Sequence, residues 1–207
     1  MSIAGNPPDP LAPWAEIVPD ALPHMTVDDL LGWPDDDGYR YELVEGVLVR
    51  VVGSGYAAAA STANISSALV AFVHPRRLGV ITSAKDIFTF PNEATGLVPN
   101  VGYYVDARRP LIVDRTRPIP FAPNLAVEVV PASQSRDDMA AKARRYLTGG
   151  TGLVWIVWPA WEQIDVWRLS RSIGVATTLT VGDILDGEDI VPGFAHFVAA
   201  VFANPLA

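Results

Sequence analysis

The spacing of apolar residues along the chain predicts where helices and strands form. Between residues 62 and 73, apolar side chains recur at the i, i+3, i+4, i+7 spacing of one helix face, and His74 caps this helix. The stripe comprises Ile65, Ala68, Leu69, Phe72 and Val73. Residues 125–130 instead form a short apolar run with one carboxylate, Glu128, inside it. Such runs are typical of strands that are covered on both faces.

Capping residues mark the other predicted helices. Thr26 and Asp29 have the spacing of a capping box, which predicts the start of a short helix. Ser133 or Ser135 can cap a later helix, and Gly149 lies just past its end. The last two segments, 181–185 and 194–202, also follow a helical pattern.

Strand patterns fill most of the remaining chain. The predicted strands lie within residues 39–52 (a hairpin), 80–82, 86–90, 101–105, 125–130, 153–158, 163–169 and 175–180. The resulting order, α-β-β-α-β-β-β-β-α-β-β-α, predicts an α/β fold with a mixed sheet flanked by helices.

The first 24 residues differ in composition from the rest of the chain. Residues 1–24 contain six prolines and little periodicity, so we interpret them as an extended arm, loosely packed or wrapped on the surface. Residues 25–207 are expected to form a single domain. Trp161 and Trp167 in this domain mark either a homodimer surface or part of its core.

Composition excludes several classes of chemistry. The 207 residues include no cysteine, which excludes disulfides, thiolate catalysis and zinc-thiolate sites. The formal net charge of −8 argues against broad nonspecific binding of nucleic acid, although a local basic groove is compatible with it. No uninterrupted apolar run reaches the roughly 18 residues of a membrane span, and no secretory signal is visible. We therefore expect no membrane partner and, by default, a cytoplasmic location.

Glu128 is the first candidate for chemistry. A buried carboxylate is costly unless it is paired or binds a cation. Lys142, one of two lysines in the chain, follows 14 residues later on a predicted helix. The two residues fit a metal-dependent hydrolytic site and a structural ion pair equally well. Glu42 could add a second carboxylate, although its place in a hairpin by itself favours a solvent-facing side chain.

The order of short motifs resembles a known family, the Uma-two family of bacterial restriction endonucleases in the PD-(D/E)XK nuclease superfamily. The similarity covers about residues 25–202. The motifs that carry it are Tyr41-Glu42-Leu43-Val44-Glu45-Gly46, Pro99-Asn100-Val101, Val127-Glu128-Val129-Val130-Pro131-Ala132-Ser133, and Lys142, Tyr146 and Gly149 ahead of Trp155-Ile156-Val157. No single motif is specific, but the ordered set is.

The resemblance implies a restriction-endonuclease-like fold and hydrolysis of DNA phosphodiesters. It implies that Mg²⁺ or Mn²⁺ is held by Glu42, Asn100 and Glu128, and that Lys142 positions the attacking water. DNA is the implied partner.

Departures from the family pattern bear on activity. Asn100 stands where the family has a metal-binding Asp, and an amide binds a hard dication more weakly than a carboxylate does. Trp158 replaces an Asp that often follows the Trp-rich strand, and a histidine common near the start of the first long helix has no counterpart in residues 56–61. We therefore expect weakened metal binding and impaired cleavage. The alternatives are a catalytically inactive binding or assembly module, or an unrelated α/β domain with a structural Glu128–Lys142 pair.

Overall fold

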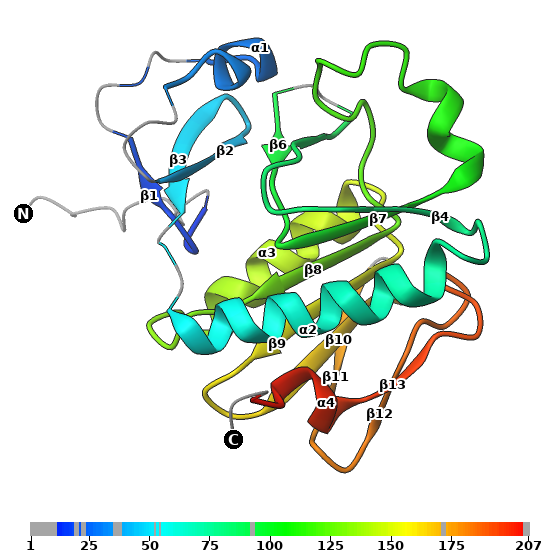
Figure 1. The fold of residues 1–207 in the computed structure, drawn as a ribbon. Helices are drawn as coiled ribbons and strands as arrows, with labels where there is room; N and C mark the ends of the chain where they lie inside the picture. Colours follow the sequence, from blue (N-terminus) through cyan, green and yellow to red (C-terminus); the bar gives the residue numbers. More distant parts are fainter. Residues whose placement is uncertain are drawn as a thin grey trace, which may run out of the picture.

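A mixed six-stranded sheet lies at the centre of the computed structural model (Figure 1). The structure describes residues 12–18, 21, 24–34, 39–51, 53, 55–91, 94–170 and 173–204. Across the sheet, the strands are β11 (Ile173–Leu179), β10 (Gln163–Ser170), β9 (Leu153–Trp158), β8 (Leu125–Val129), β7 (Val101–Val105) and β4 (Gly79–Thr82). Strands β8 and β9 are parallel, and the other neighbours are antiparallel. The mixed α/β sheet predicted from the sequence is confirmed.

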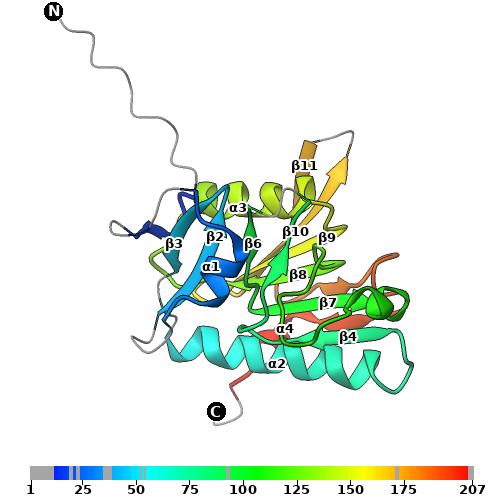
Figure 2. The same ribbon diagram turned by 90° about the horizontal axis from the view of Figure 1, so that it is seen from above.

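Two helices, α2 (Tyr56–Val73) and α3 (Arg136–Thr148), cover opposite faces of this sheet (Figure 2). Side chains along β8 alternate between the two faces because successive strand residues point in opposite directions. Leu125, Val127 and Val129 pack in the cluster on the α2 side, and Ala126 and Val130 pack in the cluster on the α3 side. Glu128 therefore points toward α3.

A second sheet, entirely antiparallel, brings the hairpin toward α3. Its strands in order are β1 (Glu16–Ile17), β3 (Val47–Val51), β2 (Arg40–Val44), β6 (Gly96–Leu97) and β5 (Phe88–Thr89). Glu45 and Gly46 have positive φ angles of 50° and 80° in the hairpin turn, which suits glycine. The predicted short helix is α1 (Val27–Leu31), and its capping box between Thr26 and Asp29 is present.

The C-terminal part corrects one helical prediction. Residues 184–186 form strand β12 (Ile184–Asp186), which pairs with β13 (Ala195–Phe197). The reason lies in the local period: Leu185 is buried between two exposed neighbours, as in a strand. The helical pattern over 194–202 is confirmed only in its second half, as α4 (Val198–Phe202). A 3₁₀ helix, η1 (Asp106–Leu111), follows β7.

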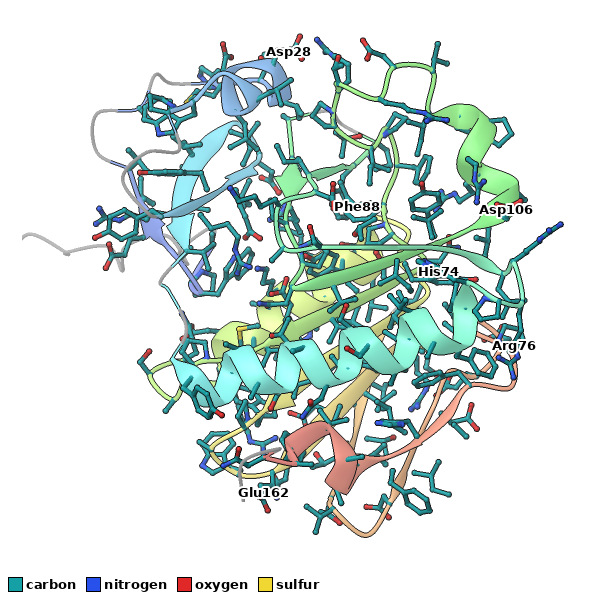
Figure 3. The ribbon with its side chains drawn as sticks, in the orientation of Figure 1. Asp28, His74, Arg76, Phe88, Asp106 and Glu162 are labelled. Carbon is teal, nitrogen blue, oxygen red and sulfur yellow. The ribbon has the colours of Figure 1, made fainter. Side chains whose placement is uncertain are left out.

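Helix α2 begins at Tyr56, before the predicted position, because the alanines ahead of residue 62 continue the helix without an apolar period. It ends with His74 as its C-cap, as predicted (Figure 3). Among the described residues, α2 is the one helix whose length and mean hydropathy, 1.3 over 18 residues, would suit a membrane span. Its Ile65, Leu69 and Val73 are fully buried against the sheet, so these side chains belong to the core.

Part of the proline-rich segment is not loosely packed. Trp14 is only 2% exposed and belongs to the core cluster on the α3 side, and β1 pairs with β3. The expectation of loose packing is therefore wrong at Trp14, whose indole is buried among residues that are distant in sequence, whereas Glu16 and Ile17 of β1 are exposed at the edge of the second sheet. Residues 1–11 lie outside the described residues. Of the two candidate surface tryptophans, Trp167 is buried at 9% exposure and Trp161 is 48% exposed.

Candidate functional site

Three charged side chains from three different elements meet in the interior. The Lys142 Nζ lies 2.9 Å from Glu42 Oε1 and 3.0 Å from Glu128 Oε1. Their side chains are 2%, 0% and 4% exposed, respectively. The Tyr146 hydroxyl donates a hydrogen bond of 2.8 Å to Glu128 Oε1. One ammonium group thus bridges two carboxylates in a space that water scarcely reaches.

The local sequence explains why these groups face one another. Lys142 and Tyr146 are four residues apart on α3 and therefore lie on the same helix face. Glu128 points to that face from β8, and Glu42 reaches it from β2 of the second sheet. The interpretation of Glu42 as a solvent-facing hairpin residue is wrong, because α3 and the N-terminal segment cover it. This contact joins residues 100 positions apart, which no hairpin pattern reveals.

Asn100 lies next to this cluster, just before β7. Its Oδ1 accepts a hydrogen bond of 3.0 Å from the Val129 N–H, directly beside Glu128, and the residue is 8% exposed. Asn100, Glu128 and Lys142 line one cavity of about 140 Å³, together with Trp14 and others. Glu42 contacts Lys142 but does not line this cavity. The structure therefore brings all four predicted residues together, with three of them at the cavity wall.

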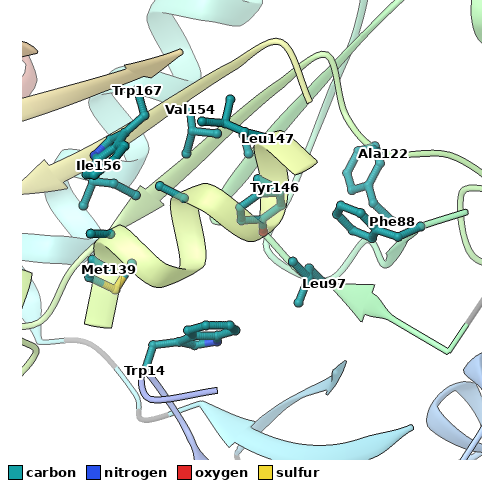
Figure 4. Close-up of a cluster of buried hydrophobic side chains, with 14 of the residues drawn as sticks. Trp14, Phe88, Leu97, Ala122, Met139, Tyr146, Leu147, Val154, Ile156 and Trp167 are labelled. Atoms are coloured by element: carbon teal, nitrogen blue, oxygen red, sulfur yellow. The ribbon is translucent and has the colours of Figure 1, made fainter. Parts of the chain in front are cut away.

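Trp14 is a site residue that sequence reasoning missed. Its Nε1 donates to Glu42 Oε2 at 3.1 Å, and the Lys142 Nζ lies 5.8 Å from the centre of its ring. Its backbone oxygen accepts a bond of 2.8 Å from Gln134 Nε2. Figure 4 shows Trp14 beside α3. The sequence offers one signal for this contact, a tryptophan within a proline-rich segment without apolar periodicity. That signal does not indicate that Trp14 contacts Glu42.

The surroundings lower the pKa of Glu42 and raise the pKa of Tyr146. Burial by itself raises the pKa of Glu42, but the charges of Lys142 and Arg40 and the hydrogen bond from the Val98 N–H lower it below its ordinary value. Burial, reinforced by the negative charges of Glu128 and Glu42, raises the pKa of Tyr146 well above its ordinary value. Glu42 is therefore held as a carboxylate, and Tyr146 is held as a neutral hydrogen-bond donor.

The side chains at the cavity offer the oxygen atoms that a hard cation prefers, but they offer it little negative charge. Mg²⁺ and Mn²⁺ take oxygen ligands, and the cavity wall offers the Glu128 carboxylate and the Asn100 amide. Both oxygens of Glu42 already accept hydrogen bonds, from Lys142, from the Val98 N–H and from Trp14. The described residues contain no group of three or more His, Cys, Asp and Glu side chains suited to a metal. The site can thus offer a cation few ligands, with Lys142 competing for the same carboxylates.

The mixed sheet lies between two helices, and the Glu–Lys–Glu cluster is buried between its inner strand β8, helix α3 and strand β2 of the second sheet; the fold is restriction-endonuclease-like. The chain belongs to the Uma2 family, described as "Putative restriction endonuclease", whose model matches residues 27–201. Five solved chains also match. One is a putative nuclease belonging to DUF820 from Anabaena variabilis ATCC 29413, with a TM-score of 0.71 and 17% identity, over 86% of this chain and 97% of that chain.

A comparison with curated proteins gives no match. The family match excludes the alternative of an unrelated α/β domain. Trp14 lies outside the matched range of 27–201, so its contact with Glu42 is formed by a segment that the match does not cover.

Proposed function

We propose that this protein is a divalent-metal-dependent DNA endonuclease whose activity is weak because Asn100 replaces a carboxylate. The observation that carries the proposal is the meeting of Lys142 with Glu42 and Glu128 at a cavity that Asn100 also lines. Nuclease family membership supports it. A purely structural ion pair needs neither the cavity nor the adjacent amide oxygen.

Each residue has a role that its position supports. Glu128 and Asn100 would hold Mg²⁺ or Mn²⁺ through their side-chain oxygens at the cavity wall, and the bound cation would polarise the phosphodiester. Lys142 would orient the attacking water and offset negative charge that develops on the phosphoryl oxygens. Glu42, together with Glu128, would hold the Lys142 ammonium group in position.

Plasmid nicking with Mg²⁺ or Mn²⁺ tests this proposal. The wild type is compared with Asn100→Asp, with Asn100→Asp combined with Glu128→Gln, and with Ser67→Asp. Ser67 is an exposed residue of α2, so the last variant adds a charge far from the cavity. We expect nicking by the wild type to be weak, to increase on the order of tenfold or more in Asn100→Asp, and to disappear when Glu128 is also changed.

The controls define what contradicts the proposal. Ser67→Asp should leave nicking at the wild-type level. Nicking that persists in EDTA, or that survives the Glu128 change, would mean that hydrolysis occurs elsewhere. No nicking by Asn100→Asp would favour the second candidate.

The second candidate is a nuclease-like binding or assembly module without catalysis. It is favoured by one specific observation: Lys142 already occupies the space between the two carboxylates and partly neutralises them. Under this candidate, Asn100→Asp leaves DNA cleavage absent at every metal concentration, and the site serves stability alone.

A further inference from the structure

Arg40 lines the same cavity as Asn100, Glu128 and Lys142. It is the first residue of β2 and lies two positions before Glu42. Strand residues two apart point to the same face of a sheet, and Glu42 contacts Lys142 of α3 from this face. The hairpin therefore places a guanidinium group at the cavity wall, beside the buried charged cluster.

The Arg40 guanidinium is not paired within the described part of the chain. No ion pair and no side-chain hydrogen bond joins it to another described residue. Both oxygens of Glu42 already accept hydrogen bonds from other groups. Burial raises the pKa of Glu42, and the positive charges of Lys142 and then of Arg40 lower it, so Arg40 lies close enough to act on the cluster.

A half-buried guanidinium with unused donors is suited to an oxyanion. Arg40 is half-buried, and its group presents five N–H donors in a rigid planar fork that matches two oxygens of a phosphate or a carboxylate. Holding such donors away from water without an acceptor is costly. Because the oxygens of Glu42 are occupied, we expect the acceptor to come from a bound anion.

The size of the cavity suits a phosphate group better than a base. Its volume of about 140 Å³ lies below the roughly 300–1,000 Å³ of sites that enclose small ligands. One water occupies about 30 Å³ in the liquid, so the cavity holds a group as large as a few waters. A tetrahedral phosphate has that size, whereas a base with its sugar is too large.

Arg40 also changes the charge that a phosphate meets at the cavity. The cluster sets two carboxylates, those of Glu42 and Glu128, against the single ammonium group of Lys142. Without Arg40 the cluster is negative, and like charges repel. The charge of Arg40 offsets this excess, so that one anionic group can enter the cavity before any cation binds.

We infer that Arg40 binds a phosphate group of the DNA substrate at the cavity, through paired N–H donors to two phosphate oxygens. The inference rests on the proposed function for the identity of the phosphate as part of a DNA strand. It assigns this contact to the backbone of the strand, so the contribution of Arg40 to binding should not depend on base sequence.

Fluorescence anisotropy with labelled DNA tests the inference in EDTA, where no metal-dependent cleavage takes part. Two short duplexes of unrelated sequence are titrated with the full chain at several NaCl concentrations, and inorganic phosphate is added as a competitor at constant ionic strength. The variants are Arg40→Gln, Arg40→Lys and, as a matched control, Arg115→Gln. Arg115 is an exposed arginine in the turn after η1 and does not line the cavity.

We expect Arg40→Gln to weaken the binding of both duplexes on the order of tenfold, because a charge-assisted contact is lost. The slope of log affinity against log salt should become shallower by about one. Arg40→Lys keeps the charge and should recover the wild-type slope, although its affinity stays lower without the planar fork. Arg115→Gln should bind with the wild-type slope. Inorganic phosphate should displace DNA from the wild type better than chloride does, and should lose this advantage in Arg40→Gln.

Several outcomes overturn the inference: no duplex binding by the wild type, equal affinity and slope in Arg40→Gln, an equal loss in Arg115→Gln, or a loss confined to one duplex. Arg40-dependent binding of inorganic phosphate without Arg40-dependent binding of DNA would assign the cavity to free phosphate instead. Urea unfolding checks that each variant is folded. If Arg40→Gln does not fold, a shallower slope in Arg40→Lys, or phosphate that competes with DNA no better than chloride, decides against the inference.

Failure of the two proposals can be told apart. Absent nicking by Asn100→Asp together with Arg40-dependent duplex binding removes only the hydrolytic function. Nicking by Asn100→Asp that Arg40→Gln leaves unchanged removes only the role of Arg40.

Discussion

Lys142 has an uncommon environment for a lysine, because its ammonium group is held between Glu42 and Glu128 and almost out of reach of water. Burying three charges is costly, and the arrangement persists only because each group has partners: Trp14 and Val98 for Glu42, and Tyr146 for Glu128. The need for a partner at Glu128 could be predicted from its place in an apolar strand. The two-sided contact of Lys142 could not.

Lys142→Ala is expected to destabilise the protein. The change leaves two buried carboxylates facing each other without a cation, so unfolding free energy should fall by about 3–5 kcal/mol. Lys85, the other lysine, is exposed and provides the matched control, and Lys85→Ala should change stability by no more than about 0.5 kcal/mol. Urea unfolding at neutral pH measures both. Similar small losses in the two variants would mean that water reaches the cluster.

Helices and strands with a clear apolar periodicity or a capping motif could be predicted from the sequence. Elements that depend on contacts between distant segments could not. The stripe on α2, the apolar strand β8 and the capping box of α1 follow directly from local patterns. Strand β12 was mistaken for a helix because three residues are too few to distinguish the two periods. The division of the strands into two sheets depends on pairing between distant segments, such as β1 with β3.

The contact of the N-terminal segment with the candidate site could not be predicted from the sequence. Trp14→Phe keeps most of the ring in the core but removes the N–H that Glu42 Oε2 accepts. The loss of a donor to a buried carboxylate should cost about 1–3 kcal/mol of stability. Trp161→Phe, at a half-exposed tryptophan, should cost no more than about 0.5 kcal/mol. Thermal or urea unfolding that shows equal effects would place Trp14 outside the site.

On the scale of the whole molecule, the order of motifs predicted the fold. It also predicted that Glu42, Asn100, Glu128 and Lys142 lie close together, whereas their roles stay a prediction. Asn100 stands where the resemblance implies a metal-binding Asp, and the weakened metal binding expected from it stays a prediction.

Direct measurement of cation binding tests the central claim, that Asn100, Glu128 and Lys142 line a weakened metal site. Calorimetric titration of the full chain with Mn²⁺ compares the wild type, Asn100→Asp, and Asn100→Asp with Glu128→Gln. The added carboxylate should tighten Mn²⁺ binding on the order of tenfold or more, and loss of the Glu128 charge should reverse the gain. Equal affinity of the wild type and Asn100→Asp, or a gain that survives the change at Glu128, would contradict the claim.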